Sequence, residues 1–179
     1  MKKSRLVCLL CALGFGMPLV AADSFVVCQS TYALCTTAKC IPVPGKTDTV
    51  SCACDVKSGY SAGQEACQSA KQTSEGEQVR SRYFPVKSHM VCSNNRPWAW
   101  CLDKVCLVDK NDPSKAQCAC SLVKDQGPYI IVTDTYNESD CETGITSSAT
   151  VAQDHEITDF LKNNDHLKAF PATVLTDHK

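Results

Sequence analysis

The sequence has few aromatic residues, 7% of its 179 positions, and no long apolar run after its first segment. A membrane-spanning helix needs about 20 predominantly apolar residues, so integral membrane contact is not expected. The formal net charge is −1, which leaves no basic surface for nucleic acid. Nucleophile elbows, phosphate-binding loops and dinucleotide fingerprints are also missing. The sequence therefore assigns no catalytic residue, no metal ligands and no cofactor.

The first residues have the pattern of an export signal. Three basic residues precede a mostly apolar stretch over 6–20, and the small residues Ala21 and Ala22 allow cleavage before Asp23. We therefore expect residues 1–22 to be a signal peptide and the protein to be secreted or periplasmic. The lysine-rich opening favours a bacterial source. Cleavage would remove two of the 14 cysteines and three of the 18 basic residues, leaving 12 cysteines and a net charge of −4.

Four cysteines form a frame that occurs twice with identical spacing. The first frame is Cys35-x4-Cys40-x11-Cys52-x-Cys54, and the second is Cys101-x4-Cys106-x11-Cys118-x-Cys120, 66 residues later. One outer cysteine precedes each frame and one follows it, namely Cys28 and Cys67 for the first and Cys92 and Cys141 for the second. Three equal gaps rarely recur by chance. The pattern indicates one six-cysteine unit written twice.

Paired cysteine counts in an exported chain are typical of a disulfide framework. Structural zinc sites prefer C-x2–4-C spacing and reduced thiols, so zinc is the weaker interpretation. Val50, Cys52 and Cys54 alternate with polar residues and would share one face of a strand. Cysteines two apart on a strand are about 6.5–7 Å apart, too far to pair with each other. Cys40 and Cys52 could close their loop directly, and twelve of the fifteen connectivities per unit remain open.

The predicted fold is small, disulfide-rich and mainly β, with two tandem homologous six-cysteine units and a short C-terminal helix. The boundaries are 23–67 for the first unit, 68–82 for a polar linker, 83–145 for the second unit and 146–179 for the tail. Within the second unit, a turn signal at Asp125–Pro128 and a β-branched run at Tyr129–Thr133 predict an added hairpin that covers the frame.

The tail contains one helical pattern. Ile157, Phe160, Leu161 and Leu167 keep helical spacing after Asp154. This acid is the predicted N-cap of a helix within Asp154–Lys168 that packs on the second unit. His155, Asp159 and His166 could share the opposite side and form a metal set. A solvated polar face explains the same residues, and is the preferred interpretation.

An aromatic strand beside the second frame is the best binding candidate. Trp98 and Trp100 alternate along the chain, so both would leave one face of a strand. Aromatic and arginine side chains are enriched at interface hot spots, and the candidate binding residues are Arg96, Trp98, Trp100 and Tyr129. The opposing interpretation is that the tryptophans form a substitute core next to a disulfide.

Three functions are consistent with these features. The preferred one is an exported, disulfide-stapled binding protein, not an enzyme, that recognises a protein or glycan outside the cytoplasm. The alternative is a small secreted hydrolase or metal-dependent enzyme that uses His155, Asp159 and His166. The third is a protease inhibitor that presents Lys46 and Lys115 in rigid, disulfide-bounded loops.

Overall fold

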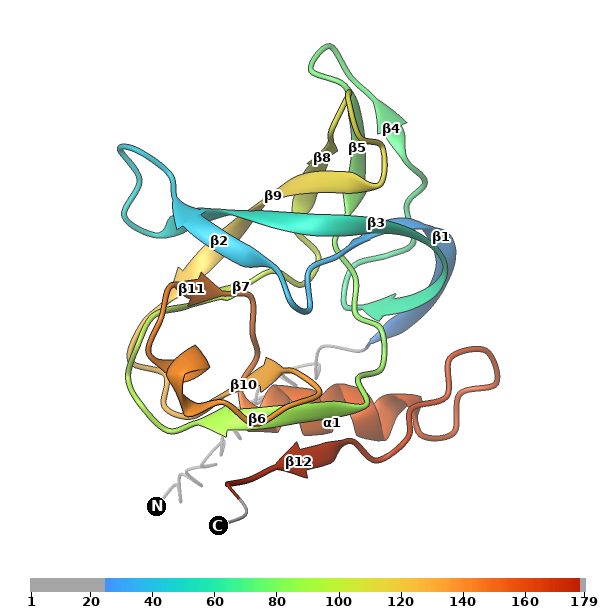
Figure 1. Cartoon of the computed structure of the whole chain (residues 1–179). Helices are drawn as coiled ribbons and strands as arrows, with labels where there is room; N and C mark the ends of the chain where they lie inside the picture. The colour runs from blue at the N-terminus through green and yellow to red at the C-terminus, as the bar shows by residue number, and fades with distance from the viewer. Residues whose placement is uncertain (1–24, 178–179) are drawn as a thin grey trace, which may run out of the picture.

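The computed structural model of the chain describes residues 25–177, so the expected signal peptide lies outside the described residues. Strands dominate, and the single α-helix of the described range lies near the C-terminus (Figure 1). The elements in chain order are β1 (Val26–Leu34), β2 (Lys39–Pro42), β3 (Thr49–Gly63), β4 (Lys71–Gln72), β5 (Glu77–Arg80), β6 (Ser88–Cys92), β7 (Trp98–Trp100), β8 (Val105–Val108), β9 (Lys115–Val123), β10 (Tyr129–Val132), the 3-10 helix η1 (Glu138–Cys141), β11 (Ile145–Thr146), α1 (Val151–Leu161) and β12 (Thr173–Leu175). The predicted mainly β class with a C-terminal helix is confirmed.

The long strands β3 and β9 form the centre of the main sheet. They pair antiparallel with each other. Each also pairs with two strands of its own region, β3 with β1 and β2, and β9 with β7 and β8. The predicted alternation is present, because Val50, Cys52 and Cys54 are buried while Ala53 is exposed. Alternating burial is expected of a strand with one face on the core.

The two frames adopt the same strand register. Cys40 stands opposite Cys52, and 66 residues later Cys106 stands opposite Cys118. At the centre of the sheet, Cys52 of β3 stands opposite Cys118 of β9, which is its own counterpart in the second frame. An antiparallel pair centred on equivalent residues has a local twofold axis, so the frames are related by an approximate twofold rotation.

Two short strands cross between the frames. β5 follows the first frame in the chain but pairs with β8 of the second, with Val79 opposite Cys106. β11 follows the second frame and pairs with β2 of the first, with Ile145 opposite Cys40. These two pairings are again 66 residues apart. The segment 68–82, expected to be a linker, thus contains β4 and β5 and contributes the buried Val79 to the core. β4 is an edge strand of the main sheet, and an exposed edge strand can have the polar composition of a linker.

All twelve cysteines of the described range form disulfides. The bonds are Cys28–Cys67, Cys35–Cys54, Cys40–Cys52, Cys92–Cys141, Cys101–Cys120 and Cys106–Cys118. As expected, the two cysteines that flank Ala53 bind different partners. Each bond also stays within the six cysteines of one predicted unit. Such a framework indicates an oxidising environment outside the cytoplasm.

The four frame disulfides pack against one another in the core. The Sγ atoms of Cys35 and Cys118, which belong to different disulfides, are 3.4 Å apart. The Sγ atoms of Cys35, Cys101 and Cys120 all lie within 4.8 Å of one another. Eight of the fifteen buried residues in this cluster are cysteines and the other seven are alanine or valine. Sulfur therefore supplies most of the bulk at the centre of the main sheet.

A second sheet and α1 lie against one side of the main sheet (Figure 1). This sheet has the order β10-β6-β12, with β10 antiparallel and β12 parallel to β6. The predicted hairpin is therefore wrong. The β-branched run does form a strand, but it pairs with β6, and Tyr129, Ile130 and Ile131 are all buried. Burial on both faces is the physical reason, because a hairpin lying over the frame would expose alternate residues.

The helix begins earlier than its sequence pattern predicted. Its N-cap is Thr150, whose side chain accepts a hydrogen bond from the Gln153 amide, while the Gln153 side chain accepts from the Thr150 amide. This reciprocal capping box satisfies two of the free amides of the first turn. The prediction of Asp154 as N-cap is wrong. Ile157 and Leu161 are buried as expected, whereas Phe160 is 41% exposed, and the buried Leu167 lies beyond the end of the helix. Within residues 25–177, no helix has the length and apolar character to cross a membrane.

The equivalent register predicts equivalent stabilisation by the inner disulfides. Removing Cys40–Cys52 or Cys106–Cys118 as a double alanine variant opens loops of the same sequence separation, 12 residues. Each variant should lose about 3 kcal/mol of unfolding free energy, the chain-entropy value for a loop of about this size. Urea denaturation without reductant measures both. A difference of more than about 1 kcal/mol between them would show that equal register does not give equal stabilisation.

Candidate binding cavity between the two cysteine frames

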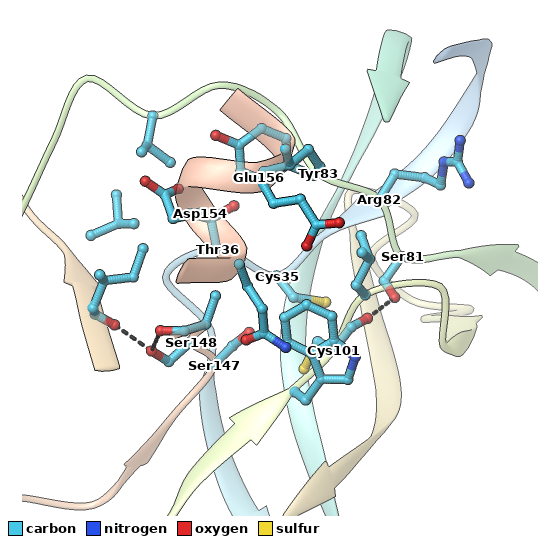
Figure 2. A pocket seen from close by; sticks show the side chains of 18 of the residues that line it. Cys35, Thr36, Ser81, Arg82, Tyr83, Cys101, Ser147, Ser148, Asp154 and Glu156 are labelled. Carbon is cyan, nitrogen blue, oxygen red and sulfur yellow. Dashed lines mark hydrogen bonds between the residues drawn. The ribbon is translucent and has the colours of Figure 1, made fainter. Parts of the chain in front are cut away.

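A cavity of about 410 Å³ lies where the two frames meet under α1 (Figure 2). Six pairs of lining residues stand 66 positions apart, so the cavity is at the approximate twofold axis. The pairs are Cys35 and Cys101, Thr36 and Leu102, Gln64 and Ile130, Ser81 and Ser147, Arg82 and Ser148, and Tyr83 and Ala149. The volume is within the range of small-molecule pockets, about 300–1,000 Å³.

Equivalent backbone hydrogen bonds hold the two segments of the cavity wall, 81–83 and 147–149. The Ser81 amide donates to Lys104 O at 2.9 Å, and the Ser147 amide donates to Ala38 O at 2.9 Å. The next residues are tied in the same way, because the Arg82 amide donates to Ala33 O and the Ser148 amide donates to Ala99 O. The backbone is thus repeated while the side chains differ. The space opposite Tyr83 is left open by the small Ala149.

Arg82 lines the cavity, but its guanidinium forms an ion pair with Asp103. Its guanidinium donates to Asp103 Oδ1 at 2.8 Å, to Glu65 O at 2.9 Å and to Val26 O at 3.0 Å. Figure 2 shows the side chain directed away from the other labelled residues. The Arg82 and Asp103 side chains are only 3% and 9% exposed. A Cβ at Gly63 would collide with both groups, so glycine is needed where this ion pair passes the backbone.

Asp154 is a buried acid without a full set of partners. It is 4% exposed, and its Oδ1 makes no hydrogen bond. Burial raises the pKa of the Asp154 carboxyl, and the charges of the nearby His89 and His155 partly oppose this rise. Burial, together with the negative charge of Asp154, raises the pKa of Tyr83 to about 12. The tyrosine is therefore neutral at physiological pH.

The predicted aromatic strand contributes both to the core and to the cavity. Trp98 is 3% exposed and stacks on Tyr129, with ring centroids 6.2 Å apart. The Tyr129 hydroxyl is close to Asn94 Oδ1, at 3.3 Å. The rings of Trp98 and Trp100 meet edge to face, with centroids 6.5 Å apart. Trp100 lines both the cavity and an open groove of about 430 Å³ beside it. Arg96 is exposed on the loop before β7.

The residues of the alternative metal site are not brought together. His155 and Asp159 are exposed on α1, whereas His166 follows the helix and stacks on Tyr60 with ring centroids 4.8 Å apart. Among residues 25–177, the sets of three potential ligand atoms within 4.8 Å are all cysteine sulfurs. These sulfurs are in disulfides, so no thiolate is present to bind a metal.

The lysines of the inhibitor hypothesis occupy different environments. Lys46 lies in the exposed loop between β2 and β3, whereas Lys115 is the first residue of β9. The Lys115 ammonium donates to Asp55 Oδ1 at 2.7 Å across the β3–β9 pair. Only Lys46 is therefore presented on a free loop.

Sequence reasoning missed Asp154, Tyr83 and Ala149 as cavity residues. One signal was available, because Asp154, Ile157 and Leu161 occupy positions i, i+3 and i+7 on one face of a helix. An acid in an apolar stripe is either paired or functional. Tyr83 and Ala149 carried no such signal, since their equivalence follows from the register rather than from local composition.

Comparison of the chain with protein-family models, with curated proteins and with solved structures found no match. The cavity must therefore be interpreted from its own residues.

The buried ion pair should contribute far more stability than an exposed one. Asp103→Ala leaves the Arg82 charge buried without its partner, which typically costs about 3–5 kcal/mol. The matched control is Asp55→Ala, which removes the acid of the Lys115 pair, whose side chains are 55% and 44% exposed. That change should cost less than about 1 kcal/mol. Equal losses in urea denaturation would contradict the assignment of the Arg82 pair as a structural tie.

Replacing the buried acid should stabilise the fold in a pH-dependent way. A carboxyl with a raised folded-state pKa is protonated in both states at low pH, and as the pH rises the unfolded state gains more from ionisation. Asp154→Asn should thus raise the unfolding free energy at pH 7, by on the order of 1–3 kcal/mol for an unsatisfied buried group. The advantage should shrink towards pH 4. Asp159→Asn, at an exposed site of the same helix, should show neither effect. A loss of stability in Asp154→Asn at pH 7 would contradict the prediction.

Proposed function

We propose that the protein is an exported, non-enzymatic binding protein that admits a group of its ligand into the cavity between the two frames. The observation that carries this proposal is a cavity of about 410 Å³ with aromatic and acidic lining on a core of four mutually packed disulfides. A pocket that keeps its shape without ligand reduces the ordering entropy lost on binding. The disulfide core favours such a rigid pocket.

The compartment follows from two independent features. The export signal expected at 1–22 would deliver the chain across the inner membrane, and six disulfides require an oxidising space to form. We propose that the mature protein is secreted or periplasmic. Its partner there is a protein or a glycan that inserts one small group, because the cavity volume excludes a whole folded surface.

Trp100 is the aromatic residue best placed to contact the ligand. Trp98 and Tyr129 are in the core, where they support the position of the Trp100 ring. Trp100 is half-buried and forms a wall shared by the cavity and the neighbouring groove. The exposed Arg96 lies two residues before β7 and can add a contact at the surface.

We further propose that the two frames descend from one duplicated unit. The identical cysteine spacing, the identical registers and the reciprocal pairing of β5 and β11 support this origin. Duplication explains why a cavity lies at the axis. In this view, two identical units first met at the axis. Later substitutions made the two walls different, with Tyr83 on one side and Ala149 on the other.

Filling the cavity tests the function. Ala149→Phe places an aromatic ring opposite Tyr83, and cavity filling should leave the fold as stable as the wild type or more so. The measurement is the rise in thermal unfolding midpoint caused by a panel of soluble peptides and oligosaccharides. Compounds that stabilise the wild type should bind Ala149→Phe about 10-fold more weakly or worse, since the ring occupies their site.

The matched control is Ala152→Phe, which adds the same ring at an exposed position of α1 outside the cavity lining. It should bind as the wild type does. Ligands that bind Ala149→Phe with unchanged affinity would place the binding surface elsewhere. A panel without any stabilising compound, together with no ligand in native mass spectra of the exported protein, would also contradict the proposal.

A further inference from the structure

Asp154 is more deeply buried than its local role requires. The capping box of Thr150 and Gln153 already provides the side-chain cap of α1, so Asp154 is not needed as a capping residue. Its Oδ1 has no hydrogen-bond partner although the residue is 4% exposed. A buried carboxylate oxygen without a partner is costly. The cavity that Asp154 lines is the place from which a partner can come.

The surroundings provide no fixed positive charge for this acid. The ion pairs of the described residues join Asp55 with Lys57 and Lys115, and Arg82 with Asp103. The titratable groups that face Asp154 are Tyr83 from the segment before β6, His89 from β6 and His155 from α1. Tyr83 is a neutral hydrogen-bond partner of the Asp154 carboxyl, and neither histidine forms an ion pair with it.

A second acid increases the negative potential of the cavity. Glu156 also lines it, and because this residue is exposed it lies at the rim. Figure 2 shows Asp154 and Glu156 on the same helix above the cavity, and Arg82 directed away from them. The guanidinium of Arg82, the arginine that lines the cavity, is thus held by Asp103 and does not neutralise the site. Of the two acids, Glu156 is therefore the one in contact with solvent, whereas Asp154 is buried.

The remaining wall is apolar and partly aromatic. Phe25, Trp100, Ile130 and Ile157 line the cavity together with the ring of Tyr83. Aromatic faces attract cations within about 6 Å of the ring centroid, most strongly for tryptophan. An ammonium group on an apolar stem matches this combination, since its charge pairs with Asp154 while its stem contacts the apolar wall.

We propose that the cavity is a binding site for a primary ammonium group on an apolar stem, with Asp154 as its counter-ion, Glu156 at the entrance and Trp100 as the aromatic wall. This inference rests on the proposed binding function and specifies its ligand class. The same chemistry is offered by a free organic amine and by the lysine side chain of a partner protein. It excludes an anionic group, which would meet two carboxylates.

Calorimetric titration with a charged probe and its neutral analogue tests the proposal. Phenethylamine should bind the wild-type protein at pH 8, which limits histidine protonation, whereas phenethyl alcohol should bind about 10-fold more weakly or not at all. Asp154→Asn keeps the size of the side chain and removes its charge, and it should weaken phenethylamine binding by about 10-fold or more. Glu156→Gln should have a smaller effect because that residue is exposed to water.

The outcomes separate this proposal from the function on which it rests. Absence of phenethylamine binding, equal binding of the alcohol, or undiminished binding by Asp154→Asn would each overturn the ammonium site. If peptides or oligosaccharides without an amine still bind in a manner blocked by Ala149→Phe, the binding function stands and the ligand class is wrong. If Asp154→Asn does not fold, the comparison of amine with alcohol on the wild type decides alone.

A blocked lysine, acetylated on its α-nitrogen and amidated at its carboxyl group, distinguishes the two sources of the ammonium. Binding as tight as that of phenethylamine, and competition between the two, would assign the site to a lysine side chain of a partner protein. Binding of phenethylamine alone would assign it to a free amine. Either result retains the ammonium site, and Ala149→Phe should abolish both.

Discussion

The contact among four disulfides at the centre of the main sheet is the constraint on which the rest of the structure depends. Their sulfur atoms meet across the approximate twofold axis, and the other buried residues of this cluster are no larger than valine. Without the cross-links, alanine and valine would bury too little apolar area to hold β3 against β9, because their side chains are small. The bonds also restrict the unfolded chain, which raises its free energy. Sulfur here performs both tasks, filling the core and limiting the unfolded state.

The rigid disulfide core determines which segments line the cavity. The axis that brings Cys52 beside Cys118 also brings the segments after the two frames, 81–83 and 147–149, to opposite walls of one cavity. Their backbones make equivalent hydrogen bonds. Different side chains at equivalent positions therefore change the lining of the cavity without disturbing the backbone of its walls. Helix α1 has no counterpart in the first half and covers the cavity from one side. Its acids are the part of the site that the twofold arrangement cannot supply.

Sequence patterns predicted those features that depend on local spacing. The cysteine frame indicated the disulfides, the alternation around Cys52 indicated β3, and the spacing of Ile157 and Leu161 indicated the buried side of α1. Features that depend on distant partners were not accessible in this way. Val79 is one buried residue in a polar segment, and nothing near it shows that β5 pairs with the opposite frame. The β-branched run of β10 correctly predicted a strand. Its β propensity did not indicate the sheet to which this strand belongs.

In the sequence, the one sign of the cavity was an acidic residue on the apolar face of a predicted helix. Asp154 interrupts the apolar face of α1, and as an N-cap it would have been an ordinary choice. Thr150 and Gln153 occupy that role, so the acid remains inside without a structural task. Places where local rules are broken without local compensation are where function is expected, since sites commonly sacrifice stability for binding. A disulfide core that makes stability less dependent on α1 allows the helix to carry such an acid. The stability supplied by the disulfide core thus compensates for the cost of burying Asp154 without an ion-pair partner.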